Sequence, residues 1–110
     1  MAYDEDLAAR IREQTAGEPV EEKRMFGGLA FLLGGHLAVS ASGQGGLMVR
    51  VEPAETDRLL AEPGAAPMEM GGRGPVDGWL RVSADAVADE ESLGLWVERG
   101  LAYARSLPPK

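Results

Sequence analysis

Residues 29–51 read LAFLLGGHLAVSASGQGGLMVRV, and this stretch decides the fold class. Leu29–Leu33 is a continuous apolar run, and Gly34-Gly35 is a hairpin signal because two-residue primed turns need positive φ. His36–Ser40 returns as a second strand, and a glycine-rich connection leads to the alternating segment Leu47–Val51. The stretch predicts three antiparallel strands joined as a meander.

Helical patterns lie on both sides of this meander. Asp4–Thr15 is amphipathic, and Asp4 is a suitable N-cap. Pro53 suits the first turn of a second helix, whose buried side is Leu59-Leu60. The last helix is the clearest element, because its small and apolar residues fall on one stripe: Leu93, Trp96, Val97, Gly100, Leu101 and Ala104.

Two further strands are expected between the second and third helices, one around Met68–Met70 and one at Trp79–Val82. The element order is then α-β3-α-β2-α. Helices interleaved with hairpins are typical of an α+β fold of two layers, with helices on one face of an antiparallel sheet. We expect one domain over residues 1–110.

The bulk composition narrows the functional class. The chain has 18 acidic and 11 basic residues and a net charge of −7, so its field repels nucleic-acid phosphates and anionic lipid surfaces. It has no cysteine, its N-terminus does not resemble a signal peptide, and its longest apolar run is too short to cross a bilayer. We therefore expect a cytoplasmic protein that binds neither nucleic acid nor membranes.

No residue pattern predicts a catalytic, metal or cofactor site. His36 is the only histidine, which excludes a His-rich metal site and leaves the serines without a paired base. The acidic clusters at residues 4–6 and 89–91 lie at helix starts, where carboxylates stabilise the helix dipole. None of the glycine clusters has the strand-to-helix context of a phosphate-binding loop. We predict a protein that is not an enzyme.

Five stretches together resemble the TfoX/Sxy N-terminal-domain family: KRMFGG at 23–28, LMVRV at 47–51, Gly78-Trp79, Trp96-Val97 and AYARSLPPK at 102–110. Arg24, Met25, Phe26, Gly27 and Gly28 form what the resemblance implies is a signature strand. The resemblance also implies an α-β3-α-β2-α fold similar to secretion chaperones, and a regulatory role like that of competence and transcription co-regulators. Longer members carry a second, helical C-terminal domain, so this chain is expected to be a short, stand-alone member.

Alternation along the strands divides the expected sheet into two faces. Leu37 and Val39, Leu47, Val49 and Val51, and Leu80 and Val82 are assigned to the face under the helices. His36, Ala38, Ser40, Met48, Arg50, Trp79 and Arg81 are assigned to the uncovered face. Because tryptophan, arginine and methionine are enriched in interfaces, we predict that Met48, Arg50, Trp79 and Arg81 contact a protein partner or a second copy. The alternative is that Trp79 fills the core and Arg50 lies at its rim.

A second hypothesis concerns small anions. Arg24, Arg50 and Arg73 are basic residues in an acidic chain, and together they would form an anion site if the fold brought them close. The alternative function is therefore a small anionic-ligand-binding protein, or an RNA- or DNA-modifying accessory protein in the sense of the methyltransferase-type names of some relatives.

Overall fold

The computed structural model describes residues 3–25, 27–69 and 75–109. The described residues form three α-helices and six strands, with two short 3-10 helices at Pro53–Glu55 and Asp85–Val87. The helices and strands, in chain order, are α1 (Glu5–Gln14), β1 (Val20–Met25), β2 (Gly28–Leu33), β3 (His36–Ala41), β4 (Leu47–Arg50), α2 (Thr56–Leu60), β5 (Ala65–Glu69), β6 (Pro75–Val82) and α3 (Glu90–Ser106).

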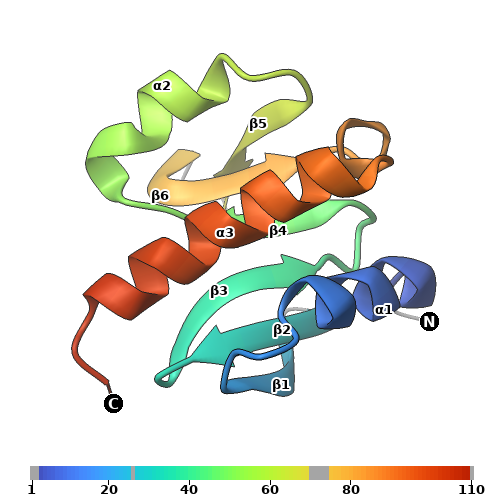
Figure 1. Ribbon diagram of the computed structural model, residues 1–110. Helices are drawn as coiled ribbons and strands as arrows, with labels where there is room; N and C mark the ends of the chain where they lie inside the picture. Colours follow the sequence, from blue (N-terminus) through green and yellow to red (C-terminus); the bar gives the residue numbers. More distant parts are fainter. Residues whose placement is uncertain (1–2, 26, 70–74, 110) are drawn as a thin grey trace.

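The strands form one antiparallel sheet in the order β1-β2-β3-β4-β6-β5. Figure 1 shows α1 and α3 on the same side of this sheet, with α3 crossing β3 and β4. The main apolar core lies between the helices and the sheet, and its largest buried side chains are Trp96 of α3 and Phe31 of β2. The α+β class and the two-layer arrangement are confirmed.

The predicted turn and cap residues have the expected backbone. Gly34 and Gly35 have φ of 62° and 85°, which is the geometry of a primed hairpin turn. The Asp4 carboxylate accepts a hydrogen bond from the backbone N–H of Leu7 at 3.1 Å, so Asp4 caps α1. The stripe on α3 is buried as predicted.

Strand β1 is the main difference from the sequence prediction. Residues 20–25 were not among the three strands expected before α2, because VEEKRM has no apolar alternation, although the resemblance implied a signature strand over residues 24–28. They pair with β2 from Val20↔Leu33 to Met25↔Gly28, at the edge of the sheet. An edge strand with charged side chains resists pairing with other chains, which explains the polar composition. β5 and β6 also begin earlier than predicted, at Ala65 and Pro75.

A β-bulge in β3 changes the predicted division of the faces. Phe31 pairs with Val39 and Leu32 with Leu37, so Ala38 is an extra residue. Leu37 therefore lies on the uncovered face, not under the helices as predicted. His36, opposite Leu33, lies on the helix-covered side, and its Nε2 is 2.7 Å from the carbonyl oxygen of Pro108. The predictions for His36, Leu37 and Ala38 were wrong, because a bulge reverses the alternation that follows from a period of two.

Candidate functional site

The four predicted partner-binding residues lie together on the uncovered face. Met48 pairs with Arg81, and Arg50 pairs with Trp79, across the neighbouring strands β4 and β6. Directly opposite residues in an antiparallel pair point to the same side of the sheet. The four side chains thus form two adjacent cross-strand pairs. We call this side of the sheet the open face, because all three helices pack on the other side.

A second apolar cluster surrounds these pairs on the open face. Ala30, Leu37 and Met48 are buried in it, at 5% exposure or less. Its partly buried members are Met25, Leu32, Met68 and Trp79. Trp79 is therefore neither a core residue under the helices nor a freely solvated one. Its ring lies half-buried on a sheet face that no helix of the described chain covers.

Gly78 sets the position of Trp79. Its φ is 87°, a conformation that favours glycine. Its N–H donates to Thr56 Oγ1 at 2.7 Å, and its carbonyl accepts from the N–H of Val51 at 2.8 Å. β6 is thereby tied to α2 and to the end of β4 immediately before Trp79.

Arg50 joins the open face to helix α3. Its guanidinium carbon is 5.3 Å from the centre of the Trp79 ring and 5.4 Å from the centre of the Tyr103 ring. A cation over an aromatic face is stabilised by about 0.5–1 kcal/mol at exposed sites. Sequence reasoning missed Tyr103, because it lies beside the buried stripe of α3 and carries no signal of its own.

Arg81 is held by neutral acceptors only. Its Nη1 donates to Gln44 Oε1 at 2.8 Å and its Nη2 to the carbonyl of Gly45 at 3.3 Å, both in the loop between β3 and β4. Among the side chains that the structure describes, no carboxylate lies within ion-pair distance of Arg81 or Arg50. Among these side chains, neither cation of the open face has an ion-pair partner.

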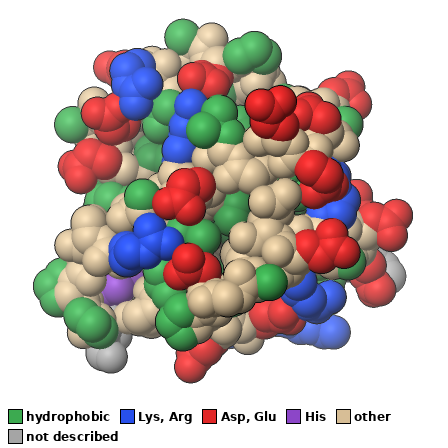
Figure 2. Space-filling model, in the orientation of Figure 1, with side chains coloured by type: hydrophobic (Ala, Val, Ile, Leu, Met, Phe, Trp, Pro, Cys, Tyr) green, Lys and Arg blue, Asp and Glu red, His purple; other side chains and the backbone are tan. Residues whose placement is uncertain are grey.

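Arginines elsewhere in the described chain are mostly paired. The five with carboxylate partners are Arg10, Arg12, Arg58, Arg99 and Arg105. Figure 2 shows acidic and basic side chains interspersed over the helix-covered side. Hydrogen bonds from Arg12 lower the pKa of the Glu22 carboxyl, which lies on β1.

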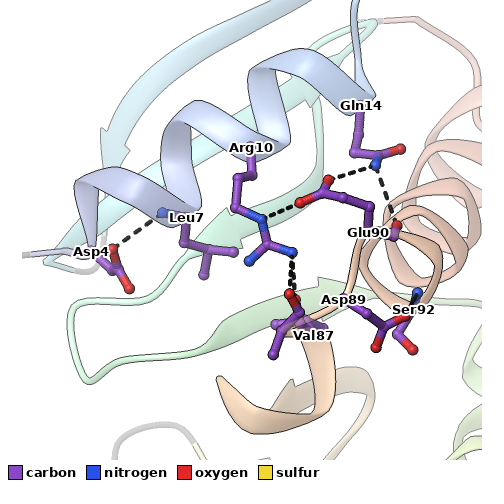
Figure 3. Close-up of polar contacts among 9 residues, drawn as sticks. Asp4, Leu7, Arg10, Gln14, Val87, Asp89, Glu90 and Ser92 are labelled. Atoms are coloured by element: carbon purple, nitrogen blue, oxygen red, sulfur yellow. Dashed lines mark hydrogen bonds and ion pairs between the residues drawn. The ribbon is translucent and has the colours of Figure 1, made fainter.

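The best-connected pair on that side joins α1 to the start of α3 (Figure 3). Arg10 Nε is 2.5 Å from Glu90 Oε2, and its Nη2 donates to the carbonyl of Val87 at 2.7 Å. Hydrogen bonds from Arg10 and Gln14 lower the pKa of the Glu90 carboxyl. The charged groups of this network are paired with one another, so they are not available to a ligand or substrate.

A depression of about 350 Å³ opens beside Arg81 on the open face. Met48, Pro67 and Met68 supply its apolar walls, and Ser40, Ser42, Gln44 and Arg81 supply its polar ones. Arg81 is the only charged residue among the described side chains that line it. The site is thus a half-apolar surface with one arginine in a depression and another against two aromatic rings.

The model of the TfoX N-terminal domain matches residues 5–104. The chain belongs to this family. At the level of the family it is a regulatory, competence-related module, and the TfoX N-terminal domain is not a known enzyme family. Among curated proteins and among solved structures, no match was found.

The TfoX signature residues do not form one strand. Arg24 and Met25 end β1, Gly27 is in the turn with φ of 74°, and Gly28 begins β2. Phe26 lies outside the described residues. A Cβ on Gly28 would collide with the carbonyl oxygen of Ala41, so this glycine lets β2 lie close to the end of β3. In this TfoX domain the two signature glycines are explained by the hairpin itself.

Two of the three residues of the predicted anion-binding set, Arg24 and Arg50, are not brought together. Arg24 pairs with Leu29 on the helix-covered side, whereas Arg50 is on the open face of β4, three strands away. Three strand spacings correspond to about 14 Å. Arg73 lies outside the described residues.

The described part of the TfoX domain has neither a metal-binding cluster nor a membrane-spanning helix. No group of three or more histidine and acidic side chains there is placed to hold a metal ion. No helix there has both the length and the apolar character to cross a membrane.

Proposed function

We propose that this TfoX domain is a non-enzymatic regulatory module that binds a protein partner through its open face. The single observation that supports this is the second apolar cluster, which lies outside the helix-covered core and contains Met48 and Trp79. The centre of this cluster is buried and its rim, which includes Trp79, is partly exposed. Large apolar surface patches with polar rims mark interaction sites.

The charges of the face favour a protein with acidic side chains. Arg50 and Arg81 border the apolar cluster and have no carboxylate partner among the described residues. A partner segment with apolar residues flanked by Asp or Glu would cover the cluster and neutralise both arginines. Nucleic acid is disfavoured, because a net charge of −7 repels phosphates.

Site-specific photo-crosslinking tests the proposal. A photoreactive phenylalanine analogue replaces Trp79 in one variant and Leu95 in another, since Leu95 is the large apolar side chain exposed on α3, at 50%. Both variants are expressed in the native cell. The expected result is one protein crosslinked from position 79 and not from position 95.

Binding of the purified partner then decides the outcome. Arg50→Gln and Arg81→Gln are each expected to weaken binding about tenfold, the loss of one charge-assisted contact. A homodimer crosslinked from position 79 would assign the face to a second copy and overturn the acidic-partner proposal. Equal crosslinking from both positions, or unchanged affinity in both arginine variants, would overturn the open-face site itself.

A further inference from the structure

We propose that the depression beside Arg81 is a binding site for a small organic carboxylate. The carboxylate would lie on the Arg81 guanidinium, and the apolar part of the ligand would lie against Met48 and Met68. This inference goes beyond the proposed protein partner, because the described lining residues of the depression all belong to one copy of the chain, and a ligand bound there would compete with the partner for Arg81.

The orientation of Arg81 is the first step of the argument. Two of its five N–H groups are used, one on Gln44 Oε1 and one on the Gly45 carbonyl. These bonds fix the guanidinium against the β3–β4 loop, and its side chain is half-buried. The remaining N–H groups form a planar fork whose geometry matches a carboxylate. A fixed, uncompensated guanidinium loses little entropy when it binds an anion.

Ser42 supplies a second donor at the rim of the depression. Its Oγ accepts the N–H of Gln44 at 3.1 Å, and among the described residues its own O–H has no acceptor. Ser40, on the floor, is 1% exposed and donates to the carbonyl of Leu29 at 3.1 Å. The site thus has free hydrogen-bond donors at Arg81 and Ser42, while the hydroxyl of Ser40 already donates to a backbone carbonyl. An anionic group accepts hydrogen bonds and therefore requires such free donors.

The walls set the kind of anion. Met48, Pro67 and Met68 line the depression, and thioether side chains adapt to ligands of different shape. An inorganic anion would leave these walls in contact with water only. A volume of about 350 Å³ lies at the lower end of the range for small-molecule sites, about 300–1,000 Å³. A carboxylate with a short apolar body satisfies both halves of the site.

Another depression contains arginines but lacks this property. It lies between α2 and α3, has a volume of about 470 Å³ and is lined by Arg58 and Arg99. Arg58 is paired with Glu55, and Arg99 with Glu62 at 3.1 Å. Its positive charge is therefore already neutralised, whereas that of the Arg81 depression is not.

The test is an NMR titration of the purified full chain labelled with ¹⁵N. The probes are sodium hexanoate, sodium acetate and hexanamide, the neutral analogue of hexanoate. We expect hexanoate to shift the backbone amide signals of Ser42, Gln44 and Gly45 in a saturable manner. Acetate should bind more weakly because it lacks the apolar body, and hexanamide should cause no comparable shift.

Two variants that each remove one positive charge complete the test. Arg81→Gln is expected to raise the Kd for hexanoate about tenfold or more, the value of a lost charge-assisted contact. Arg24→Gln, on the other side of the sheet, should leave it unchanged. If Arg81→Gln does not fold, Ser42→Ala replaces it and should raise the Kd several-fold.

Three results would overturn the proposal. They are equal shifts with hexanamide and hexanoate, an unchanged Kd in the Arg81 or Ser42 variant, and shifts confined to the helix-covered side. A blocked glutamyl peptide that binds more tightly than hexanoate would assign the same guanidinium to a partner's side chain and overturn the small-molecule site. No protein partner is present in the titration, so its result does not decide the outcome of the crosslinking test of the open face.

Discussion

Gly100 is the residue that allows α3 to lie directly on the sheet. A Cβ at this position would collide with the carbonyl oxygen of Ala38, the bulged residue of β3, and would lie 2.9 Å from Val39 Cγ1. Neither the backbone of a central strand nor a buried valine moves away without cost. Gly100→Ala should therefore lower the free energy of unfolding by about 1–3 kcal/mol, although alanine favours helix by about 1 kcal/mol. Urea denaturation measures this difference.

Gly94 provides the control within the same helix. A Cβ there would meet Gln14 Oε1 at 2.9 Å, which is the end of a flexible side chain. Gly94→Ala should leave stability unchanged or raise it by up to about 1 kcal/mol. If Gly100→Ala is as stable as Gly94→Ala, the close contact between α3 and β3 is refuted.

The bulge at Ala38 shows the limit of predicting from the sequence which face of the sheet each side chain lies on. Strict alternation placed Met48, Arg50, Trp79 and Arg81 together, because β4 and β6 are regular over these positions. It failed at Leu37 because Ala38 has no side-chain feature that indicates a bulge. Arg81 was predicted as a contact residue, but the loop bonds that fix it depend on tertiary structure and leave no local pattern.

At the scale of elements, the junction between α1 and α3 makes stability depend on pH. The folded state lowers the pKa of Glu90 through hydrogen bonds from Arg10 and Gln14, and that of Asp89 through the backbone N–H of Ser92. Carboxyls that are more acidic when folded add stability above their unfolded pKa of about 4. This stability is lost as the pH falls through that value and below it.

Glu90→Gln should therefore lower the urea midpoint at pH 6 and have progressively less effect toward pH 3. Glu91→Gln is the matched control, because Glu91 is exposed and forms no ion pair among the described residues. Urea midpoints at four pH values between 6 and 3 provide the measurement. A Glu90→Gln effect of equal size at every pH would show that the carboxylate charge is not involved.

Elements differ in how well the sequence predicts them, for a physical reason. α3 is predictable because one continuous stripe must be buried, and burial imposes a period of 3.6. β1 is not, because its residues at the sheet edge are mostly exposed and Glu22, on the helix side, is paired with Arg12. Its charges suit an edge strand, but they produce no hydrophobic period for a sequence analysis to detect.

At the scale of the whole molecule, the charge imbalance opposes folding. The net charge of −7 is confined to a body with a radius of gyration of 12.6 Å, so excess carboxylates repel one another. The surface ion pairs offset little of this, because exposed pairs contribute about 0–1 kcal/mol each. Repulsion at long range is screened more completely than pairing at short range, since the Debye length is about 10 Å at 0.1 M salt.

Raising NaCl from low to moderate concentration should therefore raise the Tm of this chain, even though it weakens every surface ion pair. Glu13→Lys supplies the control: Glu13 is exposed near the C-terminal end of α1, where a cation is favoured, and the change adds two units of charge, from −7 to −5. The variant should have the higher Tm at low salt and the weaker dependence on salt. Thermal unfolding at a series of NaCl concentrations measures both. A Tm that falls with salt would mean that the surface ion pairs stabilise the fold by more than the repulsion between excess carboxylates destabilises it.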